Sequence, residues 1–354
     1  MIGDRRGIWY AMGAAVLFGA SAPVAKALLH NAPPQLLAGL LYAGSGIGLT
    51  VVSFVQGRQS RATEASLRRR DTPWLLAAIL FGGVIGPVLL MLGLARTPAS
   101  SASLLLNLED VFTAIIAWVV FHENVDRRIA LGMLAIVAGG VALSWEGSAE
   151  LGGIAGPLAV AGACLCWAID NNLTQKVSGT DPVRIAMLKG LIAGAVNVTI
   201  ATAIGAAWPR LAIIGATLIV GFVSYGVSLV LFVLALRHLG TARTGAYFSL
   251  APFVGAALAI VAWREPPSVF LGVAAVCMAV GLWLHLTERH AHEHIHEEME
   301  HDHAHVHDEH HQHEHGPDDP PPTDPEPHSH RHHHQRLVHS HAYYPDLHHR
   351  HSHE

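Results

Sequence analysis

The sequence predicts an all-α membrane protein with ten transmembrane helices, arranged as two inverted five-helix repeats, and a disordered His-rich C-terminal tail. Of its 354 residues, 51% are hydrophobic and only 14% are charged, which is typical of multi-pass membrane proteins. Apolar runs of about 20 residues, the length needed to cross a bilayer, recur up to about Thr287. The second five runs resemble the first five, which indicates an internal duplication.

The apolar runs define the expected helices and divide the chain into residues 7–145, residues 154–286 and the tail, residues 287–354. None of them alternates like a strand, so a helical bundle is expected rather than a barrel. The first five are Gly7–Leu29, Pro34–Val55, Thr72–Ala95, Ala99–Phe121 and Arg128–Trp145. The second five are Ile154–Val177, Val183–Ala206, Leu211–Leu236, Thr241–Trp263 and Ser268–Leu286.

The basic residues predict the orientation in the membrane. Arginines cluster before the first helix and in residues 58–70, after the second, whereas the opposite joints hold only Arg96, Arg210 and Arg264. Cytoplasmic loops carry the excess of Lys and Arg. Both termini, and with them the tail, are therefore expected in the cytoplasm, with the helices in a bacterial inner membrane.

The internal repeat predicts a transporter. Leu106–Glu123 aligns with Ser249–Pro266, and the opening helices match around Phe18 and Trp167. Because each half has an odd number of helices, the second half must be inserted upside down relative to the first. Inverted repeats with a site near the membrane midplane are typical of secondary transporters. The alternative is a duplicated scaffold without transport.

The two halves resemble the EamA-type family of the drug/metabolite transporter superfamily. Each has an aromatic-small pair in its opening helix, a glutamate closing its fourth helix (Glu123 and Glu265) and a Gly-rich fifth helix. The resemblance implies export or exchange of small metabolites by alternating access. The family usually has Leu-X-Pro midway along the fourth and ninth helices. The ninth keeps it at Leu250–Pro252, but the fourth has Leu108-Glu109-Asp110, so no substrate follows by analogy.

The fourth helix carries Asn107, Glu109 and Asp110 near its midpoint. A carboxylate at the bilayer centre costs about 2.5–3.5 kcal/mol, so these groups must face a bundle interior, a water-filled cavity or a cation. Helical periodicity puts Ser103, Asn107, Asp110 and Ala114 on one stripe, so we expect Asp110 to matter more than Glu109. A fully satisfied packing network is the alternative.

The other transport-path candidates lie in the second half. Asp170 and Asn171 lie near the cytoplasmic end of the sixth helix, and Lys189 enters the seventh from the same side, so Asp170 and Lys189 are expected to pair. The pair would act either in gating or as structural glue. Tyr225 and Tyr247, in the eighth and ninth helices, are expected to line the same cavity.

Prolines and one lysine predict local features of the helices. Pro23, Pro87, Pro157 and Pro252 are expected to bend or break their helices. Lys26 lies toward the periplasmic end of the first helix, where its ammonium can snorkel to the membrane surface.

The tail contains most of the chain's 27 histidines, largely in His-X-His repeats. Neutral imidazole suits Zn, Ni, Cu and Co, and a spacing of two does not fit one face of a helix. We therefore expect a disordered, multi-site binder of divalent metal, and a solvated low-complexity tail is the alternative. The candidate ligands are His290, His292, His294, His296, His301, His303, His305, His307, His310, His311, His313, His315, His328, His330 and His332.

The leading functional hypothesis is a secondary transporter that exports small metabolites and carries a cytoplasmic tail that binds Zn, Ni or Co. The alternatives are a divalent-metal exporter fed by the tail, and a membrane-anchored metal buffer without transport. No enzyme is expected, because no nucleophile, phosphate loop or acid–base pair lies outside the membrane. The expected partners are the lipid bilayer, a small-molecule substrate and metal ions, with no nucleic acid and no required cofactor.

Overall fold

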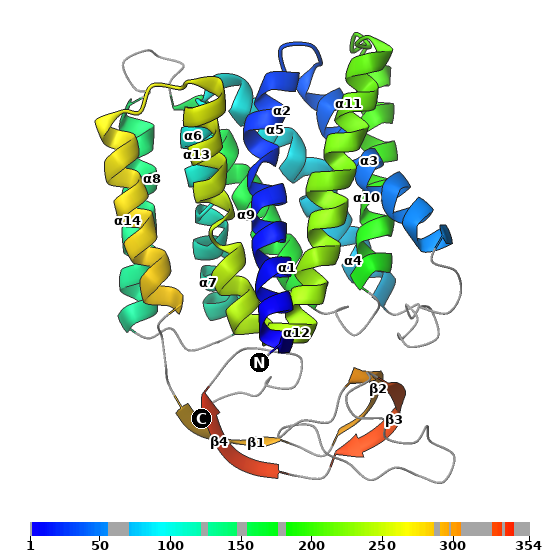
Figure 1. Ribbon diagram of the computed structural model, residues 1–354, viewed down its shortest axis with the longest axis vertical. Coiled ribbons are helices and arrows are strands. Elements are labelled where there is room, and N and C mark those ends of the chain that lie inside the picture. The colour runs from blue at the N-terminus through cyan, green and yellow to red at the C-terminus, as the bar shows by residue number, and fades with distance from the viewer. Residues whose placement is uncertain are drawn as a thin grey trace.

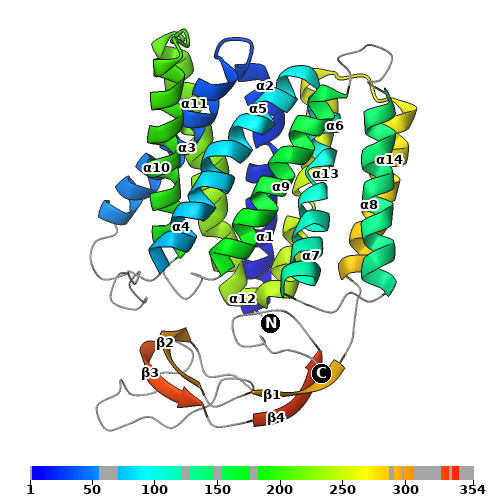
Figure 2. The ribbon, with the colours of Figure 1, turned by 180° about the vertical axis from the view of Figure 1, so that it is seen from behind.

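The computed structural model describes residues 2–55, 71–121, 127–146, 154–175 and 182–286, and in the tail residues 291–296, 299–305, 328–334 and 337–342. Up to residue 286, the described residues contain helices and turns but no strand. The helices stand side by side in one bundle, with the N-terminus at its lower end in Figure 1 and in the reverse view of Figure 2. We call the opposite end of the bundle the far end.

All ten predicted apolar runs are helical, and several of them are interrupted. The first half contains α1 (Ile2–Gly19), α2 (Ser21–Leu28), α3 (Pro34–Val55), α4 (Thr72–Ala78), the π-helical segment η3 (Ile79–Ile85), α5 (Gly86–Arg96), α6 (Ala99–Leu105), α7 (Leu108–Phe121) and α8 (Arg127–Glu146). The second half contains α9 (Ala155–Gln175), α10 (Pro182–Ala203), α11 (Leu211–Gly221), the π-helical segment η5 (Phe222–Val227), α12 (Ser228–Phe248), α13 (Ala251–Trp263) and α14 (Val269–Leu286).

Three of the four prolines singled out in the sequence lie at or just after an interruption. A proline has no N–H for the carbonyl four residues earlier and clashes with it. Accordingly, α1 ends before Pro23, η3 precedes Pro87, and α12 ends before Pro252. The expectation for Pro157 is wrong, because it lies in the first turn of α9, where a missing N–H breaks no helical hydrogen bond.

The joint expected between Leu236 and Thr241 is also wrong. Helix α12 continues through it to Phe248, and the break comes at Ser249 and Leu250. The fourth apolar run breaks at the aligned place, between α6 and α7. Both interruptions thus fall inside an apolar run rather than between two runs.

Helices of the two halves pack against one another in matched pairs. The second and seventh runs are in contact (α3 with α10), as are the fifth and tenth (α8 with α14), and the fourth and ninth (α6 with α13). The first and eighth runs pack together (α1 with α12), and the third and sixth do the same (α5 with α9). Gly46 and Gly190 let α3 and α10 approach so closely that a Cβ on Gly190 would lie 2.6 Å from the Gly46 nitrogen.

Six helical stretches in the described residues are long and apolar enough to cross a membrane: Arg6–Leu28, Pro34–Val55, Thr72–Arg96, Ala99–Val120, Val183–Ala203 and Leu211–Ala235. Two shorter apolar helices, Ala251–Trp263 and Val269–Leu284, follow them. Helices α8 and α9 are not among these stretches, and α9 carries Asp170, Asn171 and Asn172 near its end. The described residues up to 286 are thus those of a helical, multi-pass membrane protein.

The disorder expected for the tail is wrong for four segments. Strand β1 (Ala291–His296) pairs antiparallel with β4 (Leu337–Ala342), and β2 (Met299–His305) pairs antiparallel with β3 (His328–His334). A spacing of two, which fits no face of a helix, matches the period of a strand, in which alternate residues share a face. The other tail residues, among them His290, His307, His310, His311, His313 and His315, lie outside the described residues.

Candidate transport path

The fourth apolar run turns at Leu106 and Asn107, and this turn overturns the predicted polar stripe. The Asn107 amide nitrogen donates to the Leu104 carbonyl over 2.8 Å, a local bond that competes with the helix. It also lies 3.8 Å from the Met278 sulfur of α14, and Asn107 is 1% exposed. Asn107 therefore faces α14, whereas Asp110, beyond the turn, is exposed.

Glu109 faces the opposite partner helix, α9. Its Oε1 accepts a hydrogen bond of 2.7 Å from the Asn171 amide nitrogen. This contact brings two of the predicted path residues together. We therefore expect Glu109, rather than Asp110, to matter more for transport, because Glu109 contacts the second half of the chain.

Asp170 and Lys189 form the predicted charge pair. The Lys189 Nζ donates to both carboxylate oxygens, over 2.6 and 2.8 Å, and to the Thr174 hydroxyl over 3.0 Å. Thr174 in turn donates to the Asp170 Oδ1 over 2.8 Å. The Lys189 and Asp170 side chains are 18% and 11% exposed, so the pair is largely removed from solvent. The Lys189 charge is matched by direct bonds to Asp170, whereas the hydrogen-bond partner of Glu109 among the described residues is the neutral amide of Asn171.

Segment η3 lies directly against this charge pair. The Gly82 carbonyl accepts hydrogen bonds from the Tyr42 hydroxyl (2.8 Å) and from the Trp167 indole nitrogen (3.0 Å). A Cβ on Gly82 would collide with the Asp170 carboxylate. Glycine is therefore required at position 82, and α3, η3 and α9 meet there.

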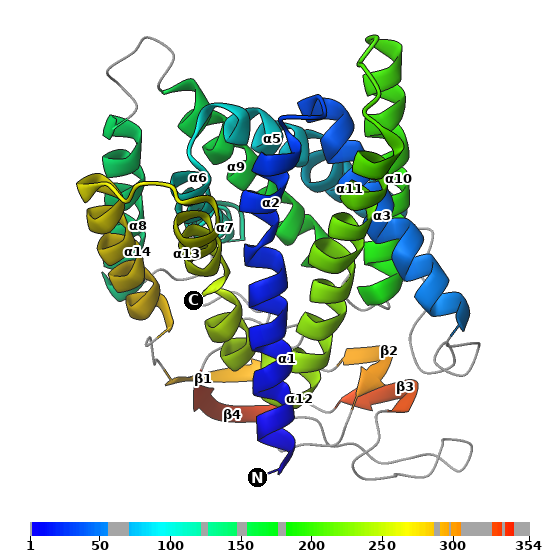
Figure 3. The same cartoon turned by 45° about the horizontal axis from the view of Figure 1, so that its top comes forward.

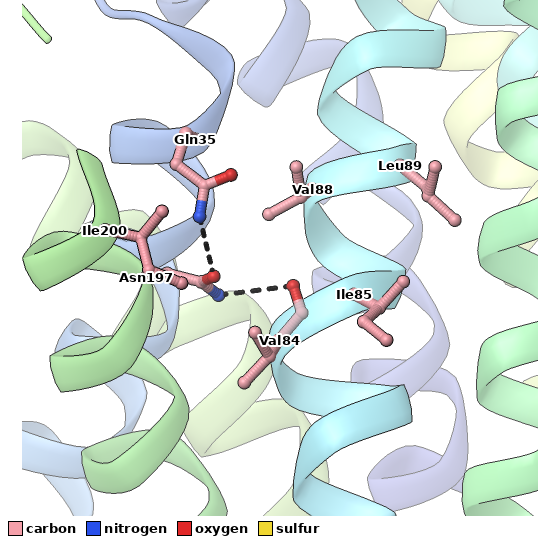
Figure 4. A pocket seen from close by; sticks show the side chains of 7 residues that line it. All are labelled: Gln35, Val84, Ile85, Val88, Leu89, Asn197 and Ile200. Atoms are coloured by element: carbon pink, nitrogen blue, oxygen red, sulfur yellow. Dashed lines mark hydrogen bonds between the residues drawn. The ribbon is translucent and has the colours of Figure 1, made fainter. Parts of the chain in front are cut away.

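Asn197 of α10 compensates for the hydrogen bond that Pro87 removes. Pro87 cannot donate to the Gly83 carbonyl, and the Asn197 amide nitrogen donates to it instead, over 3.0 Å. The Asn197 Oδ1 accepts from the Gln35 amide nitrogen over 2.9 Å. Figure 4 shows this amide pair beside a pocket of about 240 Å³, whose other lining residues are Val84, Ile85, Val88, Leu89 and Ile200.

Segment η5, in the eighth apolar run, occupies the place that η3 has in the third. Its Tyr225 ring lies 5.7 Å from the ring of Tyr42, and Phe18 of α1 packs edge-on against it at 5.8 Å. Phe18 also packs against Phe248, the last residue of α12, at 5.3 Å. Tyr247 lies next to Phe248 and is half-buried. Tyr42 thus joins the two π-helical segments, one from each half.

The structure joins most of the predicted path residues but not all. One group, which we call the polar cluster, comprises Asp170, Lys189, Thr174, Gly82 and Tyr42, and the Glu109–Asn171 contact reaches the same helix, α9. Asn107 lies outside the polar cluster, against Met278 of α14. Sequence reasoning missed Tyr42, Trp167 and Asn197 as hydrogen-bond donors. Only Pro87, which frees a backbone carbonyl, signalled the need for a donor such as Asn197.

In the described residues, no group of three or more His, Cys, Asp or Glu is placed to hold a metal ion. The groups that the described bundle does bring together are carboxylates, amides and aromatic rings.

Comparison with known proteins places this geometry among transporters. The model of the EamA-like transporter family matches residues 5–145 and 154–287. An "Uncharacterized transporter" of Methanothermobacter thermautotrophicus is 30% identical over 285 residues, which cover 77% of this chain and 83% of that protein. The "Uncharacterized transporter YyaM" of Bacillus subtilis is 21% identical over 77% of this chain and 90% of its own length.

Two further matches are a flippase subunit and a solved structure. The "Probable 4-amino-4-deoxy-L-arabinose-phosphoundecaprenol flippase subunit ArnE" of Pseudomonas paraeruginosa is 38% identical over 104 residues, which cover 29% of this chain and 89% of that subunit. A solved crystal structure, 18% identical, superposes with a TM-score of 0.58 over 79% of this chain and 95% of its own. At that identity the superposition shows a shared fold.

Proposed function

The chain belongs to the EamA-like transporter family, and we propose that this membrane transporter exports small metabolites by alternating access between two inverted halves. The family and the relatives' names indicate a transporter or flippase rather than an enzyme. We place the protein in the inner membrane of a bacterium with both termini in the cytoplasm, on the basis of the arginine distribution.

One observation carries the proposal: each half matches the family model separately, and equivalent interruptions occur in both halves. The π-helical segments η3 and η5 interrupt the third and eighth apolar runs, and short turns interrupt the fourth and ninth. Interrupted helices near the interface of two repeats are where transporters of this general design bind their substrates. Non-helical backbone inside a membrane is tolerated where it is buried in protein or lines a cavity.

The proposed path runs along α7 and α9 and past the two π-helical segments. The Glu109 carboxylate would contact a polar or cationic group of the cargo, with Asn171 holding its orientation. The Asp170–Lys189 pair would keep α9 and α10 together while the helices around them move. The aromatic rings of Tyr42, Tyr225 and Phe18 would contact apolar parts of the cargo.

For the tail we propose binding of divalent metal, which serves as a signal rather than as cargo. Between β2 and β3, His301, His303 and His305 occupy register positions facing His332, His330 and His328. Zn, Ni and Co accept imidazole ligands, which favours one of these ions as the bound metal. Protonation of imidazole, whose pKa is about 6.5, competes with the metal, so affinity should fall below about pH 6.

The experiment that tests both proposals is an efflux and resistance screen in a deletion strain. The strain would carry the full chain or a truncation after residue 287, and metals and amphiphilic metabolites would be tested in parallel. We expect the truncated chain to keep metabolite efflux and to lose only the effect of metal. If truncation abolishes export of metal and no metabolite is exported at all, the metal-exporter alternative replaces the proposal. If the full chain exports nothing and yet protects against metal, the anchored-buffer alternative does.

A further inference from the structure

A lysine holds the end of α5 at the far end of the bundle. The Lys26 Nζ donates to the Leu94 carbonyl over 2.7 Å and to the Thr97 carbonyl over 2.6 Å. The last carbonyls of a helix have no helical partner and carry partial negative charge. The ammonium therefore satisfies this helix end specifically, and Lys26 does not simply snorkel to the membrane surface.

A glutamate from the other half holds the start of α6 at the same turn. The Ala99 and Ser100 amides donate to the two Glu265 carboxylate oxygens over 2.8 and 2.9 Å. The first amides of a helix are unpaired and carry partial positive charge, so a carboxylate is the complementary partner. Glu265 belongs to the second half of the chain and α6 to the first, so these two bonds join the halves.

The residue before Glu265 is held in an unusual backbone conformation. Arg264 has φ 54° and ψ 34°, the left-handed region, and it is the only non-glycine residue with positive φ in the described part of the chain. It ends α13, and Glu265 follows directly. A left-handed residue of this kind commonly ends an α-helix, because the amides that follow it can reach back to the last helical carbonyls. The Arg264 and Glu265 amides both donate to the Ala259 carbonyl, Glu265 over 3.4 Å, and this helix end sets Glu265 directly beyond α13.

We propose that Lys26 and Glu265 form a latch on the α5–α6 turn that keeps the far end of the transport path closed, a proposal that rests on alternating access. Figure 3 shows the ends of α2, α5, α6 and α13 gathered at the far end. Moving α13 away from α6 breaks both Glu265 bonds at once. Lys26 and Glu265 are only half-buried, so release of the latch leaves neither charge in a fully buried position. The latch is therefore reversible.

Cysteine accessibility tests the latch without any knowledge of the cargo. A single cysteine replaces Ser101, which is 6% exposed and lies just beyond the two capped amides. The native cysteines Cys164, Cys166 and Cys277 are replaced by alanine. A membrane-impermeant maleimide is added from the far-end side of intact cells, and labelling rates are compared with and without Glu265→Ala. Glu265→Gln, which keeps one acceptor oxygen, serves as a milder second variant.

We expect labelling to become about tenfold faster with Glu265→Ala, the factor that corresponds to about 1.4 kcal/mol, and less so with Glu265→Gln. Lys26→Met should act in the same direction, and Glu150→Gln, which removes a glutamate from the joint between the two halves, should leave labelling unchanged. Unchanged labelling in a Glu265→Ala protein with normal membrane abundance overturns the latch. Faster labelling in a protein that transports nothing would support the latch but refute the proposed transport function.

Discussion

Asp170 and Lys189 place opposite charges between α9 and α10, at a depth where either charge alone is costly. The pair was predicted from two helices that enter the membrane from the same side. Removing one partner of a largely buried pair leaves the other uncompensated. The pair is thus the part of the site that sequence reasoning placed most accurately, because charges in a membrane have few possible partners.

We expect Asp170→Asn and Lys189→Met each to destabilise the folded protein by about 3 kcal/mol, since each leaves a buried charge unpaired. The double variant should recover part of that loss. Melting temperatures of the detergent-purified wild type, both single variants and the double variant measure the coupling. A double variant that loses the sum of the two single effects would show that the charges do not interact.

At the scale of elements, the ten apolar runs are all helical as expected, but the apolar pattern did not predict where the helices break. The stripe through Ser103, Asn107 and Asp110 assumed an unbroken helix, and the turn at Asn107 rotates Asp110 away from it. The α6–α7 turn has no proline, so nothing in the apolar pattern revealed it. Where a proline was present, as at Pro87 and Pro252, the interruption was predictable, although the donor that compensates for it was not.

Because η3 packs closely on α9 at Gly82, a substitution there tests the contact between the two segments. Gly82→Ala should destabilise the protein by about 1–3 kcal/mol and lower export, because its Cβ collides with the Asp170 carboxylate. Gly215→Ala in α11 is the matched control. No atom lies within 4 Å of its Cβ, so it should be neutral or stabilising by up to about 1 kcal/mol. Equal effects of the two changes on melting temperature would remove Gly82 from the site.

At the scale of the whole molecule, the matched contacts between halves agree with the duplication read from the sequence. Both runs of the alignment between Leu106–Glu123 and Ser249–Pro266 are interrupted near its start. The four strands of the tail were not predicted, although a spacing of two is the period of a strand. Glu123, the counterpart of Glu265, lies outside the described residues.

Reporter fusions test the inverted arrangement of the halves. A reporter fused after Glu146 should be active on the periplasmic side, and one fused after Gln175 should be active in the cytoplasm, because one helix separates them. Reporters with opposite requirements, such as alkaline phosphatase and a fluorescent protein, provide the internal control. Cytoplasmic activity after Glu146 would refute the orientation and the inversion together.

Export by Glu109→Gln protein tests the central claim, transport along the path beside α9, most directly. Glutamine keeps the size and one acceptor for Asn171 but removes the charge, so the protein should reach the membrane and melt at or slightly above the wild-type temperature. Efflux of the compound found in the screen should fall at least about tenfold, and Asp110→Asn should have the smaller effect. Normal efflux by a Glu109→Gln protein at wild-type abundance would contradict the account.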